Sequence, residues 1–385
     1  MKILHIPNYY YPNAGGIEQV CRDIVHSLGD LDIEQKVICF NETAERGGLS
    51  CKRQETVIDT VDDIEIYRCG CFTKLASQSL SLTYPGVLKK LISNYDPDMI
   101  IFHYPNPYVA SFLLPLVKKE IRFVLYWHLD ITKQKILRNL FNKQTKKLLE
   151  RADLVVATSP NYIEGSRFLS AYKNKCIVIP NCVSIDPNNI DEEVKKRAEE
   201  IRIKYQDKFI CFTIGRHIPY KGFEYLIEAS KFLNDKYVVL IGGKGPLTDS
   251  LKEKAAGDEK IEFLGFISDE ELLAYYLACD IITFSSITKN EAFGISLAEG
   301  MSFYKPAVTF TIPGSGVNFV NLNGVTGLEV PNRDYKAYAE AIMKICEDKE
   351  FYQKYAENAG NRVKDLFTFA IFKENIRKII KDIQQ

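Results

Sequence analysis

Short apolar runs rich in β-branched residues alternate along this chain with longer stretches whose apolar residues repeat at helical spacing, and the alternation occurs in two successive sets. The first set contains KILHIPN, QKVICF, IEIYRCG, DMIIFHY, RFVLYWH, DLVVATS and CIVIPN. The second contains KFICFTIG, YVVLIGG, IEFLGF, DIITFSS, KPAVTF and GLEV. Such alternation predicts parallel sheets covered by helices, so we expect an α/β chain with two doubly wound sheets.

The length of the chain agrees with two domains. One hydrophobic core rarely organises 385 residues, so two domains of roughly 180 residues each are expected. We place the first domain at residues 1–182 and the second at residues 183–366. The charge-dense segment IDEEVKKRAEEIRIKY, which follows the first set of strands, predicts a solvated helix or a linker.

Charge and cysteine content exclude several classes of protein. The 50 basic and 50 acidic residues cancel, which argues against a nucleic-acid partner and requires any anion site to be local. The ten cysteines include no C-x-x-C pair, and several lie in apolar runs, as buried thiols of a reduced cytoplasmic protein do. The N-terminus does not resemble a signal peptide, and no apolar run reaches about 18 residues, so we expect neither a signal peptide nor a membrane span.

Two doubly wound sheets predict a cleft between domains, with ligands at the carboxyl ends of the strands. The chain contains no G-x-x-x-x-G-K-[ST], and GGKGPL is not a complete G-x-G-x-x-G. Two D-x-D triplets, at residues 30–32 and 96–98, have the spacing of a metal site, but the second begins a strand and so lies at the wrong edge of a parallel sheet. We therefore expect no metal site.

The segment TIGRHIPYKGFEYLIEAS places two cations between a strand and a helix. Arg216 offers a planar, bidentate donor, and Lys221 offers a point charge five residues later. A loop that enters a helix N-terminus favours anions. Without a metal, these two side chains would have to neutralise a leaving diphosphate themselves, so we predict a diphosphate site here.

The segment NEAFGISLAEG follows a later strand and carries two glutamates eight residues apart. We predict a helix that begins near Phe293 or Gly294, with free N–H groups of Gly294 and Ile295 facing an anion. Glu291 then lies just outside the helix. Glu299 lies about one turn inside it, where it would accept hydrogen bonds from the two hydroxyls of a ribose.

Four segments in order, PNAGGIEQV, GRHIPYKG, FLGFIS and EAFGISLAE, resemble the retaining glycosyltransferases of family 4 over essentially the whole chain. The resemblance implies the GT-B fold, with two Rossmann-like domains that face each other across a cleft. It also implies a C-terminal helix over residues 367–385 that packs back on the first domain. The segment YWHLDITKQKIL is most similar to the branch that builds bacterial surface polysaccharides, such as O-antigen and capsule.

The resemblance also implies roles for individual residues. Catalytic roles fall to His128, Glu291, Arg216 and Lys221, with Glu291 on hydroxyls of the transferred sugar and His128 on the same sugar from the first domain. Donor-binding roles fall to Gly15, Gly16, Gly215, Arg216, Lys221, Gly243, Gly245, Ile267, Phe293, Gly294, Ile295 and Glu299. Ile267 would meet the base through its backbone. His103 and Asp130 are the candidates for acceptor contact, and Asp130 is alternatively placed to orient His128.

Position along the strands ranks the histidines. His128 ends the run FVLYWH, where a side chain would face the cleft, which favours a functional role. His103, in FHYPNP, competes for contact with the acceptor and ranks below His128. The other three histidines lie within a strand, on a helix or beside Arg216.

The implied reaction needs no cofactor and no metal. A hexose would pass from a UDP-sugar or GDP-mannose to a hydroxyl of a glycan or a polyprenyl-diphosphate-linked saccharide. In a retaining, front-face attack the departing phosphate oxygen takes the acceptor proton, so the protein supplies positioning and charge stabilisation. Donor base, donor sugar and acceptor stay open.

The segment over residues 131–151 carries seven basic residues against one glutamate and an apolar stripe of Ile136, Leu137, Leu140, Phe141 and Leu148. Such a helix would either rest on an anionic membrane, which gives a peripheral position at the cytoplasmic membrane, or pack on its own sheet with a basic outer face. The sequence leaves both interpretations open.

Two other functions fit the same architecture. A nucleotide-sugar epimerase also binds a nucleoside diphosphate sugar between two such domains, but it is not expected to combine GRHIPYKG with two glutamates eight residues apart. A non-catalytic nucleotide-sugar-binding subunit would tolerate loss of His128 and Glu291. Both residues are present, which favours a catalyst.

Overall fold

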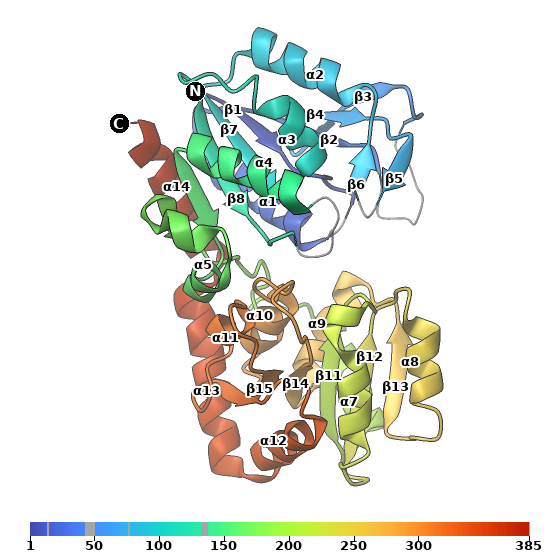
Figure 1. The fold of residues 1–385 in the computed structure, drawn as a ribbon. Coiled ribbons are helices and arrows are strands. Elements are labelled where there is room, and N and C mark those ends of the chain that lie inside the picture. Colours follow the sequence, from blue (N-terminus) through green and yellow to red (C-terminus); the bar gives the residue numbers. More distant parts are fainter. Residues whose placement is uncertain (14, 43–50, 76–77, 132–137, 385) are drawn as a thin grey trace. The chain divides into compact units, whose positions relative to one another are not determined.

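The computed structural model describes residues 1–13, 15–42, 51–75, 78–131 and 138–384. The chain packs into two compact units (Figure 1). Unit 1 comprises Met1–Thr158, Ser166–Cys182 and Phe369–Gln385, and unit 2 comprises Ser159–Gly165 and Val183–Thr368. The chain therefore passes into unit 2 for a short segment before residue 183, which the sequence pattern did not indicate.

Unit 1 is built on an eight-stranded sheet in which only the β3–β4 pair is antiparallel. Across the sheet the strands are β10 (Cys176–Val178), β9 (Leu154–Ala157), β8 (Arg122–Trp127), β7 (Met99–Tyr104), β1 (Lys2–Ile6), β2 (Glu34–Phe40), β4 (Ile64–Cys69) and β3 (Thr56–Val61). All seven runs predicted as strands of the first set are strands. The sequence pattern missed β3 and a separate hairpin of β5 (Thr73–Leu75) and β6 (Gln78–Leu80).

Helices flank the sheet of unit 1 (Figure 1). They are α1 (Gly16–Leu28), α2 (Tyr84–Lys90) with a π-helical turn (Leu91–Tyr95), α3 (Pro107–Leu113), α4 (Arg138–Arg151), a 3-10 helix (Leu169–Lys175) and α14 (Phe369–Gln384). The C-terminal α14 packs on α1: its buried stripe is Phe372, Ile376 and Ile380, and Arg377 donates to the Ser27 carbonyl at 2.8 Å.

Unit 2 is built on a six-stranded, fully parallel sheet with helices around it (Figure 1). Its strands, in spatial order, are β13 (Ile261–Gly265), β12 (Tyr237–Gly242), β11 (Phe209–Ile214), β14 (Ile281–Phe284), β15 (Ala307–Phe310) and β16 (Gly327–Val330). Its helices are α5 (Pro160–Gly165), α6 (Glu192–Lys204), a 3-10 turn (Pro219–Lys221), α7 (Phe223–Ser230), α8 (Thr248–Lys254), α9 (Asp269–Ala278), α10 (Ile295–Ser302), α11 (Val317–Val320), α12 (Tyr335–Glu347) and α13 (Lys349–Leu366). Every run predicted as a strand of the second set is a strand, so the predicted α/β class with two doubly wound sheets is confirmed.

Each sheet reverses its winding direction at one point, and the carboxyl ends of the strands there form the natural ligand site of such a sheet. In unit 1 the reversal falls between β1 and β7, because β2 and β4 extend to one side and β8 to β10 to the other. In unit 2 it falls between β11 and β14. The segments that follow these four strands are therefore where function is expected.

The charge-dense segment before β11, predicted to be a solvated helix or a linker, is the helix α6, and one of its faces is buried. Val194, Ala198 and Ile201 form its buried face, and α6 packs against α9. Its charged residues occupy the outer face, which explains why the sequence looked solvated throughout.

The two D-x-D triplets have structural roles. Asp30 pairs with Lys373 and Arg377 of α14, and Asp98 accepts the backbone N–H of Lys2 at 2.7 Å. Asp98 directly precedes β7, at the amino end of that strand as the sequence predicted. Neither triplet gathers into a cluster of metal-ligand type among the residues that the structure describes.

Over the described part of the chain, none of the helices combines the length and the apolar character that crossing a lipid bilayer requires. All ten cysteines are free thiols, and most of them are buried.

Candidate functional site

The two loops at the reversal point of unit 2 bring together a lysine and a glutamate that lie 70 residues apart in the sequence. Lys221, after β11, places its Nζ 2.5 Å from Glu291 Oε2, after β14. Both side chains are mostly buried, with 14% and 12% of their surfaces exposed. Ser286 Oγ donates to the same carboxylate oxygen at 3.0 Å. The sequence predicted both residues as site residues but did not predict their direct contact.

Backbone contacts hold these two loops against each other. Gly222 adopts a φ of +64°, and a Cβ there would lie 2.3 Å from the Ser285 carbonyl oxygen, so only glycine fits. Ser285 Oγ donates to the Lys221 carbonyl at 2.9 Å, and the Ile287 N–H donates to the Tyr220 carbonyl at 2.9 Å. The ammonium of Lys221 is therefore placed by a rigid scaffold.

Arg216 is the exposed cation of the same loop. It makes no hydrogen bond or ion pair with any residue that the structure describes, so its guanidinium is available to a ligand. Tyr220 lies nearby: burial and the Glu291 carboxylate raise the pKa of the Tyr220 hydroxyl, while Arg216 lowers it. Arg216, Tyr220, Lys221 and Glu291 thus share one electrostatic environment.

The loop after β12 packs on the loop after β11 through glycines. Gly243 has a φ of +100°, and a Cβ on it would meet the Gly215 carbonyl oxygen at 2.1 Å. A Cβ on Gly245 would lie 2.5 Å from the His217 carbonyl oxygen. The predicted donor-binding residues Gly215, Gly243 and Gly245 therefore lie together, and here glycine is required by close packing of two backbones.

Helix α10 begins at Ile295, one or two residues later than predicted, and Gly294 caps it with a φ of +90°. A Cβ on Gly294 would approach the Phe284 ring to 3.2 Å, so bulk there is disfavoured as well as the backbone angle. The first-turn N–H groups of a helix have no partner within it and favour a negative charge. Glu291 lies outside the helix and Glu299 one turn inside, as the sequence predicted.

Glu299 is a carboxylate whose charged form is disfavoured by burial. Burial raises its pKa, against the effect of Tyr276, whose hydroxyl lies 3.0 Å from Glu299 Oε2. The same hydroxyl lies 3.1 Å from the Ser296 carbonyl, and one hydroxyl hydrogen cannot serve both acceptors. An incoming hydroxyl donor would therefore find an acceptor that is incompletely satisfied. Tyr276 was not predicted from the sequence.

Two further donor-binding candidates offer only backbone. Ile267 and Phe293 are buried, and the Phe293 ring packs edge-on against Phe367 at 5.3 Å. Their predicted roles were backbone roles, and those predictions stay open.

In unit 1, His128 follows β8 directly and His103 lies in β7. His128 Nε2 lies 2.9 Å from His103 Nδ1, and the two rings are nearly parallel with centroids 5.2 Å apart. Burial lowers the pKa of His128 to about 3 and also lowers that of His103, so both rings are neutral at pH 7. His103 is fully buried behind His128 and offers no atom to an acceptor, which argues against its predicted acceptor contact.

Asp130 is also buried, and its carboxylate is occupied by protein donors. Trp127 Nε1 donates to Asp130 Oδ1 at 3.1 Å, and Ser166 Oγ donates to the same atom at 2.8 Å. The burial of Asp130 and these two hydrogen bonds argue against its predicted contact with an acceptor. Asp130 instead fixes the segment that follows β8.

The glycine loop after β1 leads into α1, with Gly15 as its N-cap and Gly16 as its first residue. A Cβ on Gly15 would lie 2.4 Å from a carboxylate oxygen of Glu18 in the first helical turn. Burial raises the pKa of Glu18 to about 7. This carboxylate beside the glycine pair was missed by the sequence analysis, because a glutamate in a first helical turn is ordinary.

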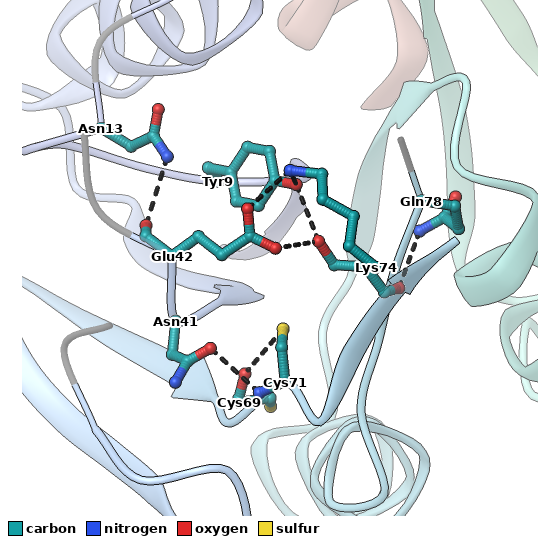
Figure 2. A network of polar contacts seen from close by, with 9 residues as sticks. Tyr9, Asn13, Asn41, Glu42, Cys69, Cys71, Lys74 and Gln78 are labelled. Atoms are coloured by element: carbon teal, nitrogen blue, oxygen red, sulfur yellow. Dashed lines mark hydrogen bonds and ion pairs between the residues drawn. The ribbon is translucent and has the colours of Figure 1, made fainter. Parts of the chain in front are cut away.

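Figure 2 shows a polar network that includes Tyr9 and Asn13, which follow β1. Lys74 Nζ donates to the Tyr9 hydroxyl at 2.9 Å and to Glu42 Oε2 at 2.6 Å. Asn13 Nδ2 donates to the Glu42 carbonyl at 3.2 Å, and the Tyr9 hydroxyl lies 2.8 Å from Ser79 Oγ. The network joins Tyr9 and Asn13, which follow β1, and Glu42, which follows β2, to the β5–β6 hairpin.

The basic segment over residues 131–151 is described only in part. Ile136 and Leu137 lie outside the described residues, and the side chain of Leu140 is likewise not described. Within α4, Leu148 and Leu149 are fully buried, while Lys143, Lys146 and Lys147 are exposed. This part packs on its own unit with a basic outer face, and membrane contact stays a prediction.

Comparisons with known proteins bear on this geometry. The family model described as Glycosyltransferase Family 4 matches residues 14–187, and that described as Glycosyl transferases group 1 matches residues 194–362. The chain is 31% identical over 373 residues to the D-rhamnosyltransferase WbpZ of Pseudomonas aeruginosa, which covers 96% of this chain and 92% of that protein. The chain belongs to glycosyltransferase family 4. The predicted resemblance is confirmed, and the protein is a glycosyltransferase.

Other relatives of this glycosyltransferase agree. It is 30% identical over 371 residues to the O-antigen chain mannosyltransferase C of Escherichia coli, with 96% of this chain and 95% of that protein covered. A crystal structure of Anabaena Alr3699/HepE in complex with UDP and glucose has a TM-score of 0.78 at 19% identity, with 99% of each chain covered. Sucrose-phosphate synthase from Thermosynechococcus elongatus has a TM-score of 0.78 at 17% identity, over 99% of this chain and 98% of that one. The fold of this glycosyltransferase is therefore GT-B.

Proposed function

We propose that this glycosyltransferase transfers a manno-configured hexose from a nucleoside diphosphate donor to a hydroxyl of a saccharide acceptor, in the synthesis of a bacterial surface polysaccharide. The support is the pair of relatives at 30% and 31% identity over nearly the whole chain, one a mannosyltransferase of O-antigen chains and the other a D-rhamnosyltransferase. D-Rhamnose is 6-deoxy-D-mannose, so the two transferred sugars share their ring configuration. The acceptor is a glycan or a lipid-linked saccharide.

The observation that carries the proposal is the Lys221–Glu291 pair at the reversal point of unit 2, with Arg216 beside it. Arg216 and Lys221 bind the donor diphosphate, and Glu291 binds hydroxyls of the sugar. When a diphosphate reaches Lys221, the ammonium exchanges part of its contact with Glu291 for the phosphate, and the carboxylate becomes free to accept sugar hydroxyls. Donor binding and carboxylate release are thus one event.

Glu299 completes the donor site from inside α10. It accepts hydrogen bonds from the two ribose hydroxyls, which replace the single hydroxyl of Tyr276. Gly294 and Ile295 offer backbone N–H groups to the phosphates at the start of the helix. The roles of Gly15 and Gly16 toward the phosphates and of His128 toward the transferred sugar stay predictions.

The chemical step proceeds with retention of configuration. As the bond between the anomeric carbon and the diphosphate breaks, negative charge develops on the departing phosphate oxygen, and Arg216 and Lys221 stabilise it. That oxygen takes the proton of the attacking acceptor hydroxyl, and the acceptor oxygen forms the new glycosidic bond on the same face. The protein supplies position and charge and needs no dedicated base.

Because Arg216 and Lys221 neutralise the negative charge of the departing diphosphate, the reaction does not need a divalent cation. Transfer assayed in the presence of a chelator such as EDTA is expected to proceed at the rate seen with magnesium present. A rate that falls tenfold or more on chelation, and recovers on adding back the metal, would refute this part of the proposal.

Nucleotide binding is the simplest test of the donor site. A ligand at 100 times its dissociation constant stabilises the native state by about 2.7 kcal/mol, so either GDP or UDP is expected to raise the melting temperature while the other has a smaller effect. Mannose alone should not raise the melting temperature. The nucleotide that stabilises the protein identifies the base of the donor. If neither nucleotide raises the melting temperature, the protein lacks the proposed donor site.

A further inference from the structure

A buried group of two histidines and one cysteine lies directly behind His128, at the reversal point of the unit 1 sheet. One nitrogen each of His5 and His103 and the sulfur of Cys21 lie within 4.8 Å of one another, and all three side chains are fully buried. The ring nitrogens without a hydrogen-bond partner are His5 Nδ1 and His103 Nε2. Buried polar atoms are rarely left unpaired, so this group requires an explanation.

The proton on His5 is fixed by its partner on the other side. Gln35 Nε2 donates to the Val25 carbonyl at 3.1 Å, which sets the orientation of the Gln35 amide. Its Oε1 then faces His5 Nε2 at 2.9 Å, and a carbonyl oxygen can only accept. His5 therefore carries its hydrogen on Nε2. Burial lowers the pKa of His5 to about 4, so the ring is neutral and its Nδ1 is a bare lone pair.

The balance of donors and acceptors then favours one form of His103. If His103 Nε2 were also a lone pair, the group would hold two acceptor nitrogens and only one donor, the S–H of Cys21. If His103 Nε2 carries the hydrogen, the group holds two donors, N–H and S–H, against the acceptors His5 Nδ1 and Cys21 Sγ. In this second arrangement the donors of the group equal its acceptors in number.

The form of His103 decides the form of His128. A neutral His103 with its hydrogen on Nε2 has a lone pair on Nδ1, which lies 2.9 Å from His128 Nε2. His128 must then carry its own hydrogen on Nε2 and donate it to His103. The remaining nitrogen of His128, Nδ1, makes no hydrogen bond within the described residues and has a free lone pair.

We propose that Gln35 fixes the tautomer of His128, with Nδ1 left as a hydrogen-bond acceptor. Its influence passes through His5 and His103, which act as positioning residues. His128 accordingly recognises a hydroxyl hydrogen of its ligand and does not donate to a carbonyl or phosphate oxygen. That the hydroxyl belongs to the transferred sugar rests on the proposed function, whereas the tautomer is a property of the free protein.

A bound metal ion is the alternative, and it predicts the opposite tautomers. Zinc is bound by neutral imidazole nitrogens and cysteine thiolates, and its histidine ligands donate their other N–H to a neighbouring acceptor. Both His5 Nδ1 and His103 Nε2 would then be ligands, and His103 Nδ1 would donate to His128. His128 would carry its hydrogen on Nδ1.

Nitrogen NMR of the intact protein distinguishes the proposed tautomer of His128 from the tautomer expected with bound zinc. Protonated and unprotonated imidazole nitrogens have well-separated 15N shifts, and the signals of His128 are identified by their loss in His128→Gln. We expect wild-type His128 to show a protonated Nε2 and an unprotonated Nδ1, in protein that contains no stoichiometric zinc. A protonated Nδ1, or one zinc ion per chain, would overturn the proposal.

Variants test whether the chain of contacts sets this form. Gln35→Met and His103→Phe keep approximate shape and remove an acceptor, so His128 should become a mixture of tautomers and kcat should fall roughly 10-fold. Tyr126→Phe is the matched control, because the Tyr126 ring stacks on both His103 and His128 while its hydroxyl has no partner. Its spectrum and kcat should be those of wild type. If folded Gln35→Met keeps the single tautomer of wild type, Gln35 does not set the tautomer of His128. If the variant fails to fold, the wild-type spectrum still decides the tautomer.

Discussion

Turnover is expected to fall about 100-fold or more when either Arg216 or Lys221 is replaced by alanine. Each side chain supplies positive charge where the departing diphosphate becomes more negative, and no metal is available in the proposed mechanism to take its place. Steady-state kinetics with a saturating donor measure the loss. It should appear in kcat, because the charge that these residues stabilise is greatest in the transition state.

The two variants differ in their effect on folding, and this separates function from stability. Arg216 is exposed and without a partner in the described structure, so Arg216→Ala should melt as the wild type does. Lys221→Ala leaves the mostly buried Glu291 carboxylate without its cation, which costs up to about 3 kcal/mol in the free energy of unfolding. Lys236, exposed at the amino end of β12 and hence at the opposite edge of the sheet, provides the control. Wild-type turnover in folded Arg216→Ala, or an equal loss in Lys236→Ala, would contradict the assignment.

Glu299→Gln is expected to raise the KM for the donor about 10- to 100-fold while it stabilises the free protein. The loss of affinity reflects two hydrogen bonds from ribose hydroxyls to a charged acceptor, which are stronger than those to a neutral amide. The gain in stability follows from the pKa of Glu299, which burial raises above 4.5. The native state therefore holds the Glu299 proton more tightly than the unfolded state does.

The pH dependence gives this prediction its sign. The stability that protonated Glu299 contributes is fully present below the unfolded pKa and is lost as pH rises through the higher folded pKa. Glutamine removes that loss, so the melting temperature of Glu299→Gln should exceed that of wild type at pH 8, and the difference should shrink toward pH 4.5 and below. Gln can still accept from the Tyr276 hydroxyl. A variant that is less stable than wild type at pH 8 and binds donor normally would contradict the role of Glu299.

The strand pattern predicted the fold because both sheets are buried on both faces, so their strands read as continuous apolar runs. The elements missed were those without that signature. β3 is an edge strand that contains no buried side chain, and β5 and β6 have three residues each. For α6 the sequence predicted a solvated helix or a linker, and it missed the buried face because only Val194, Ala198 and Ile201 form it.

The sequence identified candidate residues for the site but not the contacts between them. Arg216, Lys221, Glu291 and Glu299 became candidates because they follow strands or lie at the start of a helix. That Lys221 contacts Glu291 depends on β11 and β14 being neighbours, which no local spacing reveals. His103 was predicted as a candidate for acceptor contact, but its ring is fully buried and contacts His128.

The most direct test of the account is the release of nucleoside diphosphate from candidate donors. The wild-type protein is incubated with GDP-mannose, UDP-glucose and UDP-galactose, with and without saccharide acceptors, and free nucleotide is measured over time. The account predicts release from a manno-configured donor, acceleration by an acceptor, and a fall of about 100-fold in Arg216→Ala. The account would be contradicted if no nucleotide were released from these donors or from any other manno-configured nucleotide sugar. Undiminished release by folded Arg216→Ala would also contradict it.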